Sequence, residues 1–343
     1  MEKNIYPCVL LMNDLHIGKE NIAEFVINWN EALEICDKKS IRTIAIGGDL
    51  FLSRASQTLD ILMAVHNCLL RASVGGISVI LANGNHDLVN QDSIYGYCNI
   101  FSEHPDVTVV GEYLSMTFGD NNYLHIIPYF PEDGKFIDIL NDVKRQSLVK
   151  KAKNFLYIHE GVNGALSTPD EKELPTKIFK RFDWVFAGHY HNRCVIPKSN
   201  VEYIGSSRQH NFGEDEAKGY TILYSDGSHE FIQNKANIRY RVIDVDARRV
   251  NSNLIDHLAE LKESGRYRTK VRVSVTSADT IDKAKLIEAG ASKVEIKVAD
   301  PEQVEIYASS LFDKFDSSKL RETYKEFCDE REIEDVELGL SYL

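Results

Sequence analysis

Five short apolar segments, each followed at once by glycine or polar residues, constrain the fold of this chain more than any other feature of its sequence. The segments cover residues 8–12, 41–46, 77–82, 154–158 and 184–187. Apolar runs of this length, bounded by turn residues, are typical of strands buried on both faces. They predict an α/β fold in which the carboxyl end of each strand leads into a polar loop.

Each segment is followed by a cluster of aspartate, histidine or asparagine residues. The clusters are Asp14-Leu15-His16, Gly48-Asp49, Gly84-Asn85-His86-Asp87, His159-Glu160 and Gly188-His189-Tyr190-His191. Ligands of open α/β sheets bind at the carboxyl ends of the strands. We therefore expect the polar side chains of these five clusters to meet at one edge of the molecule.

The donor atoms in these clusters indicate a metal centre. Imidazole, carboxylate and amide groups together suit Mn²⁺, Fe²⁺ or Zn²⁺ better than Ca²⁺ or Mg²⁺, which prefer oxygen ligands. Two cations about 3.5–4 Å apart, joined by a bridging carboxylate, can hold both the attacking and the leaving oxygen of a phosphoryl group. Asp49 is the candidate for the bridge, because Gly47 and Gly48 let the backbone approach the ions without a Cβ atom in the way.

The five clusters, in this order, resemble those of the calcineurin-like metallophosphoesterase superfamily. The resemblance implies two mixed β-sheets packed as a sandwich and flanked by helices. It also implies a first metal ion held by Asp14, His16, Asp49 and His191, and a second held by Asp49, Asn85, His159 and His189. The nucleophile would then be a metal-bound hydroxide, and no serine or cysteine stands in a nucleophile-elbow context.

The resemblance gives catalytic roles to two further residues. His86 would contact the scissile phosphate and would protonate or stabilise the leaving oxygen. Asp87 would orient the imidazole of His86.

Finer motifs resemble those of the SbcD-type DNA-repair nucleases and their tailed-phage counterparts. That branch carries Gly-Asp-Leu-Phe, Gly-Asn-His-Asp, Gly-His-x-His and Tyr-Ile-Gly-Ser, and the last motif is residues 203–206 here. Protein serine/threonine phosphatases instead carry an Asp-Arg-Gly sequence after the second motif and glutamate at the position of Asp87. Many members of the nuclease branch have histidine where this chain has Leu52, which leaves the balance between exonuclease and endonuclease activity open.

Two more residues are candidates for substrate binding. Arg54 offers a positive charge close to the position of the missing histidine. His210 lies in a loop that follows the Tyr-Ile-Gly-Ser motif and could approach the substrate, although a plain surface loop explains it equally well. His66 and His125 are better explained as core or boundary residues.

The sequence predicts three regions. Residues 1–235 form the phosphoesterase domain, 236–300 a small α/β capping domain of alternating strands and helices, and 301–343 a pair of C-terminal helices. The resemblance implies that 301–343 binds an SbcC-type coiled-coil ATPase, although these helices could also pack on their own domain. It also suggests a homodimer formed through the predicted helices 21–37 and 57–72.

Charge, cysteine content and hydropathy narrow the class of protein. The net charge of −12 argues against a generally basic nucleic-acid binder. Region 236–300 is the one with more basic than acidic residues, so it could contact a DNA backbone or form a solvated face. Six scattered cysteines without a C-x-x-C pair, together with the lack of a signal peptide or an apolar run of about 20 residues, predict a reduced cytoplasmic protein. A viral protein would then act in the host cytoplasm.

The function predicted from these features is a two-metal DNA nuclease that uses Mn²⁺ and acts with an SbcC-type ATPase in DNA break processing, recombination or repair. Two alternatives stay open. The first is a metal-dependent phosphodiesterase or phosphatase for small molecules, and the second is a non-catalytic scaffold that keeps the fold.

Overall fold

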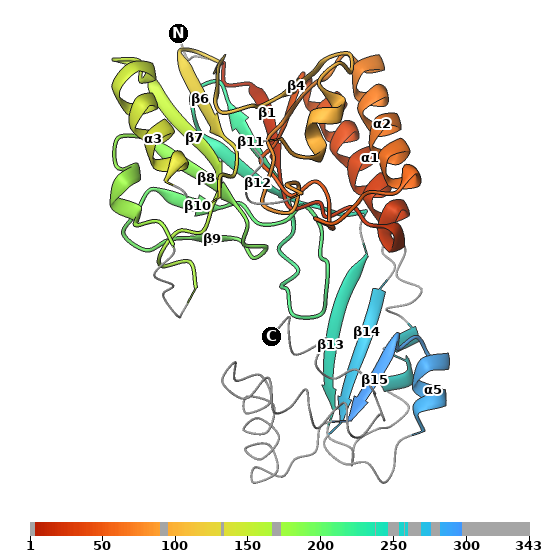
Figure 1. Cartoon of the computed structure of the whole chain (residues 1–343). Helices are drawn as coiled ribbons and strands as arrows, with labels where there is room; N and C mark the ends of the chain where they lie inside the picture. Colours follow the sequence, from red (N-terminus) through yellow and green to blue (C-terminus); the bar gives the residue numbers. More distant parts are fainter. Residues whose placement is uncertain are drawn as a thin grey trace, which may run out of the picture. The chain divides into compact units, whose positions relative to one another are not determined.

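The computed structural model describes residues 4–89, 95–131, 134–166, 173–236, 238–245, 254–256, 258–259, 269–275 and 282–296. The chain divides into two compact units, of which the first consists mainly of residues up to Tyr240 and the second begins at Arg241. Two β-sheets with helices on their outer faces make up the first unit (Figure 1). Within the described part of the chain, no helix has the length and hydropathy needed to cross a membrane.

The first sheet has the strand order β12-β11-β1-β2-β3-β4. Its strands are β1 (Pro7–Met12), β2 (Thr43–Ile46), β3 (Ser78–Leu81), β4 (Val107–Val109), β11 (Gly219–Tyr224) and β12 (His229–Gln233). Strands β1 to β4 run parallel, whereas β11 pairs antiparallel with both β1 and β12. Parallel neighbours require crossover connections, and helices α1 and α2 provide two of these.

The second sheet has the order β5-β6-β7-β8-β10-β9. Its strands are β5 (Leu114–Phe118), β6 (Asn122–Ile127), β7 (Lys153–His159), β8 (Trp184–Gly188), β9 (Cys194–Val195) and β10 (Val201–Tyr203). Strands β6, β7, β8 and β10 are parallel, and β5 and β9 are antiparallel edge strands. Both sheets are therefore mixed, which confirms the predicted fold class.

Strand β1 shows how one strand serves two cores. Val9 and Leu11 belong to an apolar cluster that also contains Leu124 and Tyr157 of the second sheet, so these side chains fill the space between the sheets. Leu10 and Met12 point the opposite way and join the cluster formed with the helices. Because alternate residues of a strand face opposite sides, a fully apolar run is required here. This explains why apolar residues dominate the five segments, in which the polar residues Arg42, Thr43, Ser78 and Asn154 are confined to the first half.

Helices cover the outer face of each sheet. Helices α1 (Ile22–Lys39) and α2 (Leu59–Val74) pack on the first sheet through residues such as Phe25, Trp29 and Val65. Helix α3 (Lys135–Asp142) and the π-helical turn η3 (Val143–Ser147) pack on the second sheet. Short 3₁₀ turns complete the connections as η1 (Lys19–Asn21), η2 (Tyr97–Phe101) and η4 (Thr176–Phe179). The predicted helices 21–37 and 57–72 therefore correspond closely to α1 and α2.

The second unit contains a small sheet with the order β13-β14-β15. Its elements are β13 (Arg239–Val245), β14 (Thr269–Val275), α5 (Lys283–Glu288) and β15 (Lys293–Ile296), and β14 and β15 are parallel. Leu258, Val273 and Leu286 are buried together in a core of their own. The predicted boundary after residue 235 falls just before the division at Tyr240. The predicted helices of 301–343 lie outside the described residues.

Candidate metal centre

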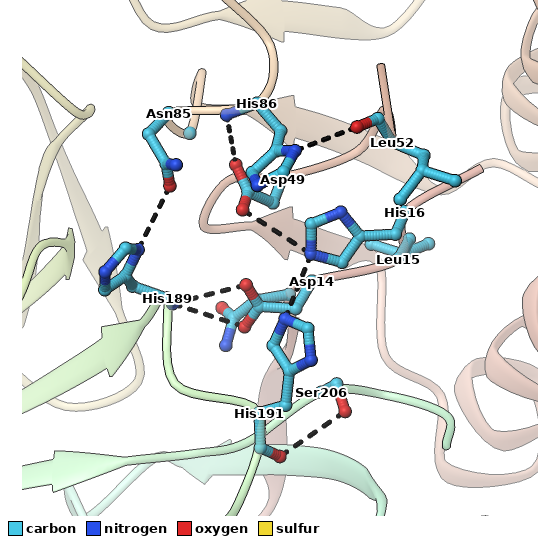
Figure 2. Close-up of polar contacts among 12 residues, drawn as sticks. Asp14, Leu15, His16, Asp49, Leu52, Asn85, His86, His189, His191 and Ser206 are labelled. Carbon is cyan, nitrogen blue, oxygen red and sulfur yellow. Dashed lines mark hydrogen bonds and ion pairs between the residues drawn. The ribbon is translucent and has the colours of Figure 1, made fainter. Parts of the chain in front are cut away.

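The polar clusters that follow β1, β2, β3 and β8 converge at one edge of the sandwich (Figure 2). His159, the last residue of β7, joins them through its contact with Asp49. Three of these strands belong to the first sheet and two to the second. The ligand loops of β1 and β2 are joined by backbone hydrogen bonds. The amide of Asp14 donates to the carbonyl of Gly48 at 3.1 Å, and that of His16 donates to the carbonyl of Asp49 at 3.0 Å. Backbone hydrogen bonds thus hold the two loops in register.

Four of the predicted ligands have a left-handed backbone. The φ angles are 51° at Asp14, 45° at His16, 52° at Asp49 and 94° at His189. Non-glycine residues adopt positive φ rarely, and such strain of about 1–3 kcal/mol per residue is concentrated at functional sites. The backbone is therefore bent to direct these side chains into the site.

Two glycines are required by close approach. A Cβ atom on Gly48 would lie 2.3 Å from Nδ1 of His159, and the φ of Gly48 is 135°. A Cβ atom on Gly84 would lie 2.3 Å from the amide nitrogen of Asp49. The glycine of each Gly-Asp or Gly-Asn pair thus leaves the space that a neighbouring ligand or its backbone occupies.

One group of candidate ligands consists of Asp14, His16 and His191, whose donor atoms all lie within 4.8 Å of one another. The Nε2 atoms of His16 and His191 face each other at 3.0 Å. The Asp14 carboxylate accepts hydrogen bonds from the amide of His189, with its two oxygens 3.2 and 3.3 Å away. This is the first predicted ligand set apart from Asp49.

Asp49 occupies the position expected of a bridge. Its Oδ2 atom lies 3.5 Å from Nε2 of His16 and 3.2 Å from Nε2 of His159. On the other side of His159, Nδ1 of His189 lies 3.0 Å from the amide oxygen of Asn85, and the His159 and His189 ring centroids are 5.7 Å apart. The structure thus brings all seven sequence-predicted ligands into one cluster.

The donor set fits divalent cations. Nδ1 of His16 and Nδ1 of His159 are buried and have no hydrogen-bond partner among the described residues. Nδ1 of His191 lies 2.8 Å from a Glu214 oxygen, which can only accept, so a neutral His191 ring presents a lone pair at Nε2. The Nε2 atoms of His16 and His191 face each other, so both nitrogens can bind the same cation. The residues present therefore fit the metal ions that the sequence predicts.

The electrostatics favour positive charge at the same place. Burial lowers the pKa of His16 to about 3 and that of His189 to about 4, so both rings are unprotonated, as metal ligands must be. At His159 burial acts in the same downward direction, but the carboxylates of Asp49 and Asp14 outweigh it and raise the pKa to about 9. An environment that favours a proton on His159 favours a divalent cation for the same reason.

His86 and Asp87 differ from the expectation in one respect. Nδ1 of His86 lies 2.8 Å from the carbonyl oxygen of Leu52, so this carbonyl, and not Asp87, orients the imidazole. The Asp87 carboxylate accepts hydrogen bonds from the backbone amides of Gly84, Leu50 and Phe51. Asp87 thus ties the loop after β3 to the loop after β2. Burial and the nearby Asp49 raise its pKa to about 7.

Sequence reasoning did not identify the residues that support His191. Beside the contact of Glu214 with its ring, buried Lys218 donates a hydrogen bond to the His191 carbonyl at 2.6 Å. The amide of Ser206, in the Tyr-Ile-Gly-Ser motif, donates to the same carbonyl at 3.0 Å. Buried Arg208 donates to the carbonyls of Leu15 and His16 at 2.8 and 3.1 Å. The Tyr-Ile-Gly-Ser motif can be recognised in the sequence, whereas Glu214, Lys218 and Arg208 belong to no sequence motif.

The structure also locates the remaining predicted residues. Nε2 of His210 lies 2.7 Å from the carbonyl of Asp14, and its ring centroid is 5.1 Å from that of His16, so it borders the metal cluster. Arg54 is exposed and lines a cleft next to Asn85. His125 is fully buried and bonded to Tyr113, as expected of a core residue.

The basic residues of region 236–300 are partly engaged within the protein. Arg239 is buried and donates to the carbonyl of Asn234, while Arg272 pairs with Glu295 at 3.3 Å. Four other arginines of this region, Arg248, Arg249, Arg266 and Arg268, lie outside the described residues.

The sequence of this chain is similar to those of known proteins. The family model described as calcineurin-like phosphoesterase matches residues 9–193. Over 224 residues the chain is 25% identical to "Putative phosphoesterase 078R" of Invertebrate iridescent virus 3, which covers 62% of this chain and 61% of that protein. Over 228 residues it is 25% identical to "Putative phosphoesterase 244L" of Invertebrate iridescent virus 6, which covers 63% of this chain and 75% of that protein. The match to 078R thus spans less than two thirds of that relative.

Two solved structures share a similar region. A dimetal phosphatase from Danio rerio aligns with a TM-score of 0.40 and 10% identity, over 63% of this chain and 91% of its own. The nuclease MPE of Pseudomonas putida aligns with a TM-score of 0.29 and 15% identity, over 63% of this chain and 84% of its own.

Proposed function

Because the chain belongs to the calcineurin-like phosphoesterase family, we propose that it is a two-metal phosphodiesterase that cleaves DNA as an exonuclease or an endonuclease. The observation that carries this proposal is the convergence of seven donor residues and His86 at one edge of the sandwich. A structural metal site needs fewer ligands than this. His86 lies beside the cluster and is not one of the seven proposed ligands, so it is available for catalysis.

The ligand residues divide the work between them. Asp14, His16, Asp49 and His191 would hold one cation, and Asp49, Asn85, His159 and His189 would hold the other. Bound divalent cations, which we propose to be Mn²⁺, would polarise the phosphoryl group and lower the pKa of water. The mixed nitrogen and oxygen donors support this choice of metal over Mg²⁺.

His86 would act on the phosphate directly. One of its ring nitrogens belongs to a group with His16 and Asp49 whose donor atoms lie within 4.8 Å of one another. The carbonyl of Leu52 can only accept a hydrogen bond, so the Nδ1 atom of His86 carries hydrogen and Nε2 is left for the substrate. A protonated His86 could then donate its Nε2 hydrogen to the leaving oxygen.

Support for DNA as substrate comes from the sequence motifs of the nuclease branch and from the use that the structure makes of one of them. The Tyr-Ile-Gly-Ser segment connects two ligand loops, because the amide of Ser206 donates to the carbonyl of His191 at 3.0 Å and the side-chain amide of Asn13 donates to the carbonyl of Gly205 at 3.3 Å. Arg54, exposed beside the cluster, would contact a DNA phosphate.

A cleavage assay tests the substrate and the metal together. Purified protein is incubated with linear duplex DNA, hairpin DNA, supercoiled plasmid and bis-p-nitrophenyl phosphate, each with Mn²⁺, Mg²⁺ or EDTA. We expect Mn²⁺-dependent cleavage of DNA and of the small diester. If the protein hydrolyses the small diester but cleaves none of the DNA substrates, a phosphodiesterase for small molecules is favoured. If it hydrolyses no substrate with any metal, a non-catalytic scaffold is favoured.

We propose two partners in addition. Region 301–343 would bind an SbcC-type coiled-coil ATPase, since its apolar stripes stand on an acidic background of 12 acidic and 5 basic residues. A homodimer would form through α1 and α2, where Met63 and Leu70 are 46% and 41% exposed beside Ile22 and Val26. Light scattering of the M63E/L70E variant tests the dimer, which should become a monomer.

A further inference from the structure

A cleft of about 520 Å³ opens directly beside the second ligand set. Asn85 and His189 form one of its walls, so a molecule in the cleft lies next to the metal cluster. Its other lining residues include Tyr129, Phe130, Gly161, Glu173 and Tyr190. A volume of this size is typical of sites for small molecules or for one unit of a polymer.

Aromatic side chains form part of the lining of the cleft. Tyr129 and Tyr190 are half-buried, and Phe130 is almost completely buried. Tyr190 is fixed against Tyr203, with 4.9 Å between the ring centroids. Rigid aromatic rings beside a phosphodiester site are the platforms on which unstacked nucleic-acid bases stack.

A buried carboxylate in the cleft has a free acceptor atom. Glu173 is 8% exposed, and one of its oxygens accepts a hydrogen bond from the hydroxyl of Tyr190. Its other oxygen, Oε2, is buried and has no hydrogen-bond partner within the described part of the chain. A buried acceptor without a partner is costly, and this cost is removed when a ligand supplies an N–H or O–H group.

Glu173 is held firmly in this position. The amide of the next residue, Leu174, donates to the carbonyl of Gly161 at 2.8 Å, and Asn163 donates from its side chain to the carbonyl of Glu173 at 3.0 Å. Gly161 leaves room for the side chain, because a Cβ atom there would lie 3.3 Å from Cγ of Glu173. These hydrogen bonds fix the backbone of Glu173 beside Gly161, two residues after the proposed metal ligand His159 at the end of β7.

We propose that this cleft binds the unstacked base of a nucleotide that adjoins the scissile phosphate, and that Glu173 Oε2 accepts a hydrogen bond from that base. The inference rests on the proposed nuclease function. Aromatic stacking supplies affinity for any base, whereas the carboxylate discriminates among bases by their donors.

The carboxylate favours guanine and disfavours thymine. Guanine offers two adjacent donors, N1–H and the exocyclic amine, on its Watson–Crick edge. The single N3–H donor of thymine stands between two carbonyl oxygens, which a carboxylate repels. A hydrogen bond to a charged group changes relative rates by about 10- to 100-fold, so the preference should be measurable.

The test compares the dinucleotides dGpdG, dApdA, dCpdC and dTpdT in Mn²⁺, with kcat/KM measured for each. We expect dGpdG to exceed dTpdT by about tenfold or more. The Glu173→Gln variant should reduce this ratio to near one, because a neutral amide no longer repels the thymine carbonyls. Glu103→Gln, at an exposed position, is the matched control and should keep the ratio.

Two further measurements separate the possible failures. Binding of guanosine and thymidine monophosphates in EDTA, followed by calorimetry, reports on the cleft without metal-dependent turnover, and guanosine monophosphate should bind more tightly. Equal binding and equal rates for all bases in the wild-type protein would overturn the subsite, even if Glu173→Gln failed to fold. Failure of the wild-type protein to hydrolyse bis-p-nitrophenyl phosphate, which has no base, would instead overturn the proposed function.

Discussion

Individual side chains of the centre divide into those that would touch substrate or metal and those that position them. Glu214 is a positioning residue, because its carboxylate orients His191 and is itself held by the amide of His210 at 3.0 Å. Although burial would raise the pKa of Glu214, hydrogen bonds from His191 and His210 lower it, so the carboxylate stays charged. Such partners of metal-bound histidines strengthen the ligand.

Replacing Glu214 by glutamine should therefore weaken metal binding. We expect the affinity for Mn²⁺ to fall about 10- to 100-fold, because the amide can present its N–H group to His191 and favour the wrong tautomer. Calorimetric titration of the metal-free protein measures this loss. Glu216→Gln, two residues along the same loop, serves as the control. An unchanged Mn²⁺ affinity in Glu214→Gln would show that the contact does not set the ligand.

Replacing His86 by alanine should have the opposite pattern. The variant should bind Mn²⁺ nearly as well as the wild-type protein, because the seven proposed ligands remain, while kcat falls about 10²- to 10⁴-fold. Steady-state hydrolysis of a diester and metal analysis of the same sample measure the two effects. His66→Ala, on the exposed side of α2, is the matched control. Normal turnover in His86→Ala would remove this histidine from the mechanism.

Strands and loops show what the sequence could and could not predict. The five ligand-bearing strands were predictable because each is a mainly apolar run that ends in a polar cluster. Helices α1 and α2 were predictable because their apolar residues follow helical spacing. Glu214 was not predictable, since its loop has no periodicity and reaches His191 only through the tertiary path of the chain. The role of Asp87 was misassigned because adjacency to His86 in sequence suggested contact, whereas its carboxylate turns toward backbone amides.

A buried ionic cluster joins elements of the two sheets. Glu202 of β10 accepts a hydrogen bond from the indole of Trp184 of β8 at 2.9 Å. A Glu202 oxygen also lies 2.9 Å from Nε2 of His229 on β12, and the carboxylate forms an ion pair with Arg193. Its side chain is almost completely buried. Although burial raises the pKa of Glu202, the contacts with His229 and Arg193 outweigh it and lower the pKa below its usual value.

Glu202→Gln should lower the free energy of unfolding by about 3–5 kcal/mol at pH 7, because it leaves Arg193 without its charged partner. Because the folded pKa is depressed, the stability that the charged carboxylate contributes is present above its unfolded pKa of about 4.3 and is lost as pH falls through the folded value. The difference between variant and wild type should therefore shrink below about pH 4.3. Urea unfolding across this range measures it.

An exposed pair provides the control for this prediction. Glu34 and Lys38 on α1 are separated by 3.6 Å and are largely solvent-exposed, so Glu34→Gln should change stability by less than about 1 kcal/mol. A pH-independent loss of stability in Glu202→Gln would mean that packing, and not the charge, explains its effect.

For the whole molecule, the region that can be compared with its prediction is 236–300, and only over its described residues. The alternating pattern of 236–300 corresponds to β13, β14, α5 and β15. Two of its basic residues have environments that composition cannot reveal, because Arg239 is buried and Arg272 is paired with Glu295.

Deletion of residues 301–343 should abolish co-purification with the ATPase partner. The isolated phosphoesterase unit has its own cores and ligand loops, so Mn²⁺-dependent hydrolysis of bis-p-nitrophenyl phosphate should persist in the deleted protein. Affinity purification of the tagged proteins and a diesterase assay measure the two outcomes. Retained co-purification would place the partner site elsewhere.

Metal loading should stabilise the molecule as a whole. A ligand that binds only the folded state, at one site and at 100 times its Kd, adds about 2.7 kcal/mol to the free energy of unfolding. Urea unfolding with and without Mn²⁺ measures this gain, which should be much smaller in His159→Ala. An identical midpoint in both conditions would contradict binding at this centre.

The origin of the ligands in both sheets has a mechanical consequence. Asp14, His16, Asp49 and Asn85 follow strands of one layer, and His159, His189 and His191 follow strands of the other. Cations bound between these residues would link the two sheets at the edge that carries the ligands. Removal of the metal by a chelator should then weaken the contact between the sheets, first at this edge. Amide hydrogen exchange should therefore become faster in β7 and β8 before it does so elsewhere.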